Sequence, residues 1–81
     1  MSNYVMQAVA GKNLVRTIAV YETEGGSKSR QVDIIGRYRV GENRPLEFDC
    51  EKYCKWQARP ECKIRPIAKL LAEAHGCNCR N

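Results

Sequence analysis

Apolar and polar residues alternate through the first half of the chain, the pattern of β-strands with one buried face. Strands are predicted over residues 4–9, 14–23, 30–40 and 44–48. The short segments between them, 11–13, 24–29 and 41–43, contain glycine and are predicted turns. Because these connections are short, the four strands are expected to form an antiparallel meander.

The last third of the chain has the spacing of helices. Asp49 is a predicted N-cap for a helix over residues 50–58. A second helix is expected over 64–75, and Gly76 suits the left-handed position that ends it. The predicted fold is a single α+β domain in which two C-terminal helices pack on one face of a four-stranded antiparallel sheet, in the order ββββαα.

Alternation along the second and third strands predicts which side chains face the core. The inward set is Ile18, Val20, Val32 and Ile34, and the outward set is Ala19, Tyr21, Gln31 and Asp33. With both helices on one face, the other face is open to solvent. Tyr21 and Asp33 are therefore expected together on this open face, either as an ordinary cross-strand pair or as part of a docking surface.

The length of 81 residues limits the core, and the five cysteines suggest how the fold gains further stability. The N-terminal residues show no basic region followed by a long apolar run. Neither a signal peptide nor a membrane span is expected, and a cytoplasmic location is predicted. Thiols in that compartment stay reduced, so clustered cysteines there bind metal more often than they pair.

Four cysteines form two pairs, one at the start of the first predicted helix and one after the second. They are Cys50, Cys54, Cys77 and Cys79. Structural zinc takes four Cys or His ligands, so a zinc site of these four is predicted, with Cys62 or His75 as substitutes. Free thiols, disulfides and an iron–sulfur cluster are the alternatives. His75 is also explained as a helix C-terminal residue that suits the dipole, and no catalytic arrangement is evident, so an enzyme is not expected.

Basic and aromatic residues alternate in two stretches of a chain whose net charge is +5. The candidates for contact with nucleic acid are Arg37, Arg39, Arg44, Lys55 and Trp56. Cations can bind phosphates while an aromatic ring stacks on bases, so a zinc-stabilised nucleic-acid-binding module is the alternative function. Trp56 and Tyr53 are also explained as anchors that hold the first helix against the sheet.

Several short motifs resemble those of a small phage family, the type I-F anti-CRISPR proteins. They are IAVYE at 18–22, GSK at 26–28, VD at 32–33, VG at 40–41, FD at 48–49 and Trp56. The resemblance spans residues 14–57 with small gaps and leaves the cysteines and the C-terminal tail without a counterpart. It implies a ββββαα fold and binding to the backbone subunits that hold the crRNA in the Cascade surveillance complex.

The resemblance also implies which residues contact the partner. Tyr21 matches a strand tyrosine of the family, Asp33 matches an acid on the next strand, and Tyr4 matches an N-terminal tyrosine, all on the open sheet face. The implied function is that of a non-enzymatic inhibitor in the host cytoplasm, which sterically blocks binding of target DNA. A third interpretation is a structural or redox protein whose role depends on its thiols.

Overall fold

The computed structural model describes residues 3–23 and 29–79, which form five strands and two helices. The elements are β1 (Asn3–Ala10), β2 (Val15–Thr23), β3 (Ser29–Arg39), β4 (Pro45–Phe48), α1 (Cys50–Gln57), β5 (Cys62–Ile64) and α2 (Pro66–His75). The four predicted strands and both predicted helices are confirmed to within two residues at each end. Residues 24–28 of the turn predicted over 24–29 lie outside the described residues.

The sheet differs from the predicted four-stranded antiparallel meander. Its strand order is β4-β3-β2-β1-β5, and β5 runs parallel to β1. Backbone hydrogen bonds from Tyr4 N to Glu61 O (3.1 Å) and from Arg65 N to Met6 O (3.0 Å) flank this pairing. A strand of three residues is too short to show a period, which is why the sequence suggested a loop there. The fold is α+β, with a mixed five-stranded sheet.

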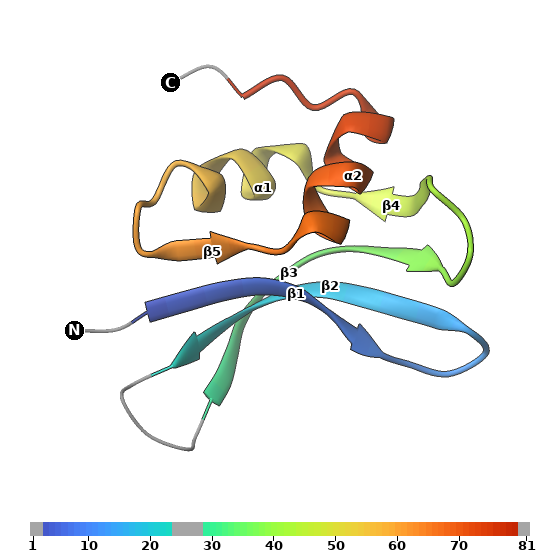
Figure 1. The fold of residues 1–81 in the computed structure, drawn as a ribbon, viewed down its shortest axis with the longest axis horizontal. Helices are drawn as coiled ribbons and strands as arrows, with labels where there is room; N and C mark the ends of the chain where they lie inside the picture. Colours follow the sequence, from blue (N-terminus) through green and yellow to red (C-terminus); the bar gives the residue numbers. More distant parts are fainter. Residues whose placement is uncertain (1–2, 24–28, 80–81) are drawn as a thin grey trace.

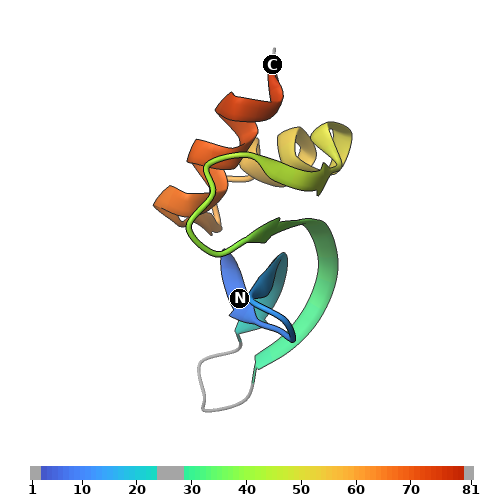
Figure 2. The same cartoon turned by 90° about the vertical axis from the view of Figure 1, so that its right-hand side faces the viewer.

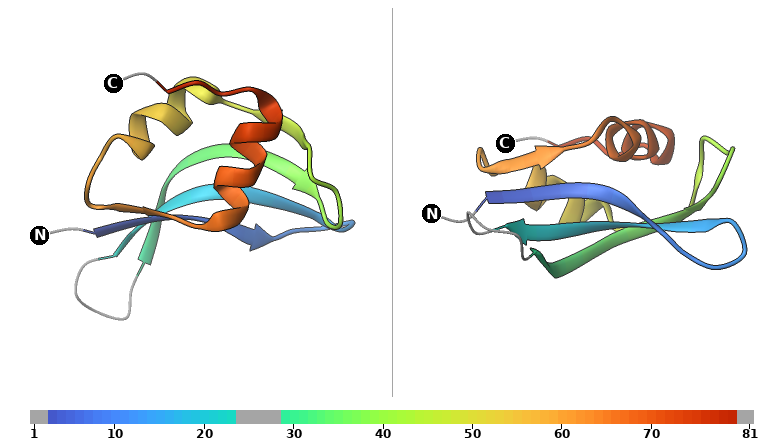
Figure 3. Two further views of the ribbon diagram at one scale, coloured as in Figure 1. Left: turned by 45° about the horizontal axis from the view of Figure 1, so that its top comes forward. Right: turned by 60° about the horizontal axis from the view of Figure 1, so that its bottom comes forward.

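Both helices lie on the same face of the sheet, as predicted (Figure 1). The sheet curls strongly, because β3 bends along its length and carries β4 up beside the helices (Figures 2 and 3). Gly36 lies within this bend, opposite Phe48 of β4. A Cβ atom at Gly36 would collide with the carbonyl oxygen of Glu47, so glycine allows β4 to approach this closely.

The core lies between the helices and the sheet. Its fully buried large side chains are Met6, Ile18, Val20, Ile35 and Leu71. Tyr53 and Trp56 of α1 are only 6% and 7% exposed, which confirms that they anchor this helix to the sheet. Both predicted helix ends are also confirmed: the Asp49 side chain accepts a hydrogen bond from Lys52 N (3.0 Å), and Gly76 is left-handed with φ 89°.

Within residues 3–23 and 29–79, neither helix is long and apolar enough to cross a membrane.

Candidate functional site

One face of the sheet is not covered by the helices, and we call it the open face (Figure 3). Its residues on β1, β2 and β3 include Val5, Gln7, Val9, Thr17, Ala19, Tyr21, Gln31, Ile34 and Arg37. The pairing arranges two central rows, Val5–Tyr21–Gln31 and Gln7–Ala19–Ile34. Neither row contains a charged residue. The centre of the open face is therefore apolar or neutral, although 28% of the chain is charged.

Tyr21 lies at the middle of the open face, as predicted. It is half-buried between Val5 and Gln31, and its hydroxyl donates a hydrogen bond to Gln31 Oε1 at 3.3 Å. Ile34 pairs with Ala19 in the neighbouring row of the open face, and it is 46% exposed. Ile34 was predicted to face inward, and that prediction is wrong.

Two β-bulges in β3 explain why strict alternation failed. Tyr21 pairs with Gln31 and Val20 with Asp33, which leaves Val32 as an extra residue, and Ile35 is extra in the same way between Ile34 and Gly36. Each bulge reverses the alternation after it. Asp33 therefore lies on the same face as Val20, under the helices, and Ile34 lies on the open face. The prediction that Asp33 shares the open face with Tyr21 is wrong.

Tyr4 is also on the helix-covered face, contrary to the expectation from the resemblance. Its ring lies 5.0 Å from the Trp56 ring, and its hydroxyl donates to Glu22 Oε2 at 3.3 Å. The Arg59 guanidinium stands 4.6 Å from the centres of both rings. We call Tyr4, Trp56, Arg59, Asp33 and Lys52 the aromatic–ionic cluster. Cation–π and ring contacts of this kind attach the C-terminal end of α1 to β1.

Asp33 is the polar centre of that cluster. Its carboxylate accepts hydrogen bonds from Trp56 Nε1 (2.8 Å) and from the backbone N–H of Ile34 (2.9 Å), and it pairs with Lys52 Nζ at 3.1 Å. Burial alone would raise the pKa of Asp33, but the bonds from Trp56, Lys52 and Ile34 outweigh it and hold the pKa below its ordinary value of 3.8. Asp33 thus joins β3 to α1.

The residues predicted to bind nucleic acid do not form a stacking surface. Trp56 is buried within the aromatic–ionic cluster, so its ring is not available to a base. Arg37 pairs with Glu47 at 3.1 Å and Arg39 with Glu42 at 3.3 Å. Arg44 and Lys55 are exposed, on the loop before β4 and on α1 respectively.

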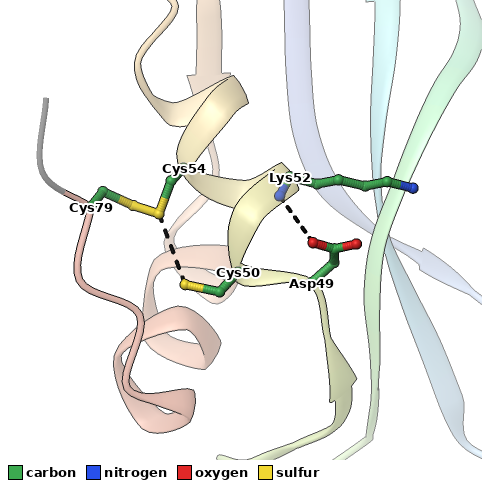
Figure 4. The surroundings of a disulfide bond; sticks show 5 residues. All are labelled: Asp49, Cys50, Lys52, Cys54 and Cys79. Carbon is green, nitrogen blue, oxygen red and sulfur yellow. Dashed lines mark hydrogen bonds between the residues drawn. A yellow bond between two sulfur atoms is a disulfide. The ribbon is translucent and has the colours of Figure 1, made fainter.

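Three cysteines of the predicted zinc site, Cys50, Cys54 and Cys79, come together (Figure 4), and Cys77 stands two residues before Cys79. Cys54 and Cys79 form a disulfide, and Cys50 Sγ lies 3.9 Å from Cys54 Sγ. The pKa of the Cys77 thiol is raised to about 12, mainly by burial and to a smaller extent by the neighbouring Cys50 thiol. The Cys77 thiol is therefore protonated at neutral pH. We call Cys50, Cys54, Cys77 and Cys79 the cysteine cluster. The disulfide is one of the alternatives that the sequence left open.

The two predicted substitutes have other surroundings, although Cys62 lines a pocket together with Cys77 and Cys79. Cys62 is a buried residue of β5, and burial raises the pKa of its thiol. His75 ends α2, as its interpretation as a helix C-terminal residue predicted, and its ring lies 5.6 Å from that of Phe48. With the disulfide formed, residues 3–23 and 29–79 contain no group of three or more His, Cys, Asp or Glu side chains that could hold a metal ion.

Sequence reasoning missed two features of these surfaces. Arg59 lies beyond the end of α1, so helical spacing does not mark its contact with Trp56. Val5 and Ile34 flank the centre of the open face, and only the pairing register reveals them.

Searches against protein-family models, curated proteins and solved structures each found no match.

Proposed function

We propose that this chain is a non-enzymatic binding protein that docks on a protein partner through the open face, with Tyr21 as its anchor. The observation that carries the proposal is the uncharged centre of that face in a chain of net charge +5. Interface centres are typically depleted of charge and enriched in tyrosine, while their rims are polar. Lys63 of β5 lies beside Val5, and Arg37 of β3 lies beside Thr17, so charged residues adjoin the uncharged rows and supply such a rim.

Tyr21 suits the role of anchor. Its backbone belongs to β2, which is hydrogen-bonded on both sides, so little order has to be gained on binding. Its hydroxyl donates a hydrogen bond to the exposed Gln31, an interaction that a partner group can replace at small cost. Tyrosine buries a large area for few rotatable bonds, and hot spots are enriched in it.

The partner we propose is a backbone subunit of the type I-F Cascade surveillance complex, which the resemblance implies. The inhibitor would occupy the surface that receives target DNA in the host cytoplasm, and its mechanism would be steric. Tyr4 and Asp33 are excluded from the proposed interface because both are engaged in holding α1 to the sheet. Tyr21 alone of the three residues in the resemblance belongs to it.

The test is the affinity of the full chain for purified type I-F Cascade. Tyr21→Ala should weaken binding by about 30-fold or more, the effect of losing a hot-spot side chain. Lys69→Ala, an exposed change on α2, is the matched control and should bind like the wild type. Unchanged binding of folded Tyr21→Ala would disprove the docking face, whereas no binding by the wild type would disprove the partner.

A further inference from the structure

The cysteine cluster assembles sulfur atoms from two parts of the chain. Cys50 and Cys54 are one helical turn apart on α1, and both reach toward the tail that follows α2 (Figure 4). The left-handed Gly76 turns that tail, and Cys77 N donates to Ala72 O at 2.9 Å. This Schellman turn fixes Cys77 and directs the chain back along α1. Three of the four cysteines thus have backbones held by hydrogen-bonded structure.

A disulfide by itself does not account for this arrangement. Of the four, Cys54 and Cys79 are bonded, yet Cys50 Sγ lies 3.9 Å from Cys54 Sγ, and Cys77 stands two residues before Cys79. A structural disulfide does not need two further thiols next to it, and free thiols near a disulfide promote exchange. The position of Cys50 and Cys77 therefore indicates a role for all four sulfur atoms together.

One sulfur–sulfur distance in the cysteine cluster, that between Cys50 and Cys54, matches the spacing in a zinc site. With Zn–S bonds of about 2.3 Å, the sulfur atoms of a tetrahedral site lie about 3.8 Å apart. Cys50 Sγ and Cys54 Sγ are 3.9 Å apart. Cys79 belongs to neither a helix nor a strand, so separation of its sulfur from that of Cys54 needs no rearrangement of the core.

We propose that, once the Cys54–Cys79 disulfide is reduced, Cys50, Cys54, Cys77 and Cys79 bind one zinc ion as four thiolates. A thiol reductant such as glutathione supplies two electrons and two protons to the disulfide and is itself oxidised to its own disulfide. Four thiols and Zn²⁺ then give a zinc tetrathiolate and release four protons. An oxidant such as oxidised glutathione reverses the sequence by re-forming the Cys54–Cys79 bond and expelling zinc. This inference is independent of the proposed function.

The test is native mass spectrometry of the full chain with one equivalent of zinc, after reduction and again after oxidation. The reduced wild type should retain one zinc ion, and the oxidised wild type none. Cys50→Ser is the most informative variant, because it leaves both disulfide cysteines in place. It should still form the Cys54–Cys79 bond but should bind zinc more weakly by over about 100-fold, beyond the loss of 10- to 100-fold that removing an outer-shell partner causes.

Cys62→Ala is the matched control, since it removes a cysteine that lies outside the cluster and should keep full zinc affinity. Circular dichroism of each variant checks that the fold persists. The proposal is overturned if the reduced wild type takes up no zinc, if zinc uptake depends on Cys62 and not on Cys50, or if reoxidation joins Cys50 to Cys77 in place of Cys54 to Cys79.

Discussion

The two faces of the sheet are built from the same three strands but differ in chemistry. On the helix-covered face, aromatic rings, an acid and two cations contact one another around Asp33 and Trp56. On the open face, Tyr21 makes one hydrogen bond, to an exposed glutamine, and its neighbours Val5 and Ile34 are apolar. Side chains on the first face are committed to holding the fold. Those on the second are free to contact a partner.

The division between the faces depends on the two bulges of β3. Without them, Asp33 would lie beside Tyr21 and Ile34 would enter the core, so the faces would exchange their chemistry. A resemblance in sequence motifs therefore does not carry over the orientation of a side chain. In this molecule the acid of the VD motif holds a helix to the sheet, while the tyrosine of the IAVYE motif lies half-buried on the open face.

The largest predicted effect is on the helix-covered face. Trp56→Ala removes a buried ring and its contacts with Tyr4 and Arg59. It also removes the hydrogen bond that the indole N–H donates to Asp33. It should lower the free energy of unfolding by about 3–5 kcal/mol, a large share of what a small domain has. Urea denaturation followed by circular dichroism measures this. A loss below about 1 kcal/mol would show that α1 is held mainly by other contacts.

A smaller effect is expected at the bend that closes the helix-covered face. Gly36→Ala places a Cβ against the Glu47 carbonyl, so β4 must shift, at a cost of about 1–3 kcal/mol in unfolding free energy. Gly41→Asn is the comparison: a side chain there meets nothing within 4 Å, so its cost is only that of the positive φ of 90°, which asparagine tolerates better than most residues. Equal losses from the two variants would mean that the close approach of β4 is unimportant.

The loss of folding stability at acidic pH should depend on Asp33. Its pKa is lowered in the folded state, so its contribution is fully present above its ordinary pKa of 3.8 and is lost as pH falls through the lower folded value. Asp33→Asn keeps an acceptor oxygen and should cost about 1 kcal/mol near neutral pH. The variant should also lose less stability than the wild type between pH 5 and 2, as measured by thermal unfolding. If the variant and the wild type lost the same stability between pH 5 and 2, the contacts assigned to Asp33 would be contradicted.

The smallest effect is predicted for the open face. Tyr21→Phe removes one exposed hydrogen bond of 3.3 Å and leaves the ring, so unfolding free energy should change by less than about 0.5 kcal/mol. The same denaturation experiment measures this value. A loss above about 1.5 kcal/mol would make Tyr21 part of the structural framework and would remove the contrast between the faces.

Much of the fold could be predicted from local signals. Alternation identified β1 to β4, and Asp49 and Gly76 marked helix ends because capping depends on residues within one turn. The predicted zinc site placed Cys50 and Cys54 beside Cys77 and Cys79. The Cys54–Cys79 disulfide shows that the two pairs of cysteines do meet.

The features of the fold that could not be predicted from the sequence depend on how the strands pair. The parallel strand β5 has three residues, too few for a period, and its pairing with β1 joins segments more than fifty residues apart in the sequence. The bulges at Val32 and Ile35 involve residues with ordinary strand preferences, so nothing local marks them. The side on which Asp33 lies follows only from the register with β2.

The central claim is that the open face binds and the helix-covered face stabilises. The most direct test measures Cascade affinity and unfolding free energy together for Tyr21→Ala and Asp33→Ala. Tyr21→Ala should lose affinity by about 30-fold while its stability changes by less than about 1 kcal/mol. Asp33→Ala should lose about 1.5–3 kcal/mol of stability and, where folded, keep wild-type affinity. The account is contradicted if Asp33→Ala loses the affinity and Tyr21→Ala the stability.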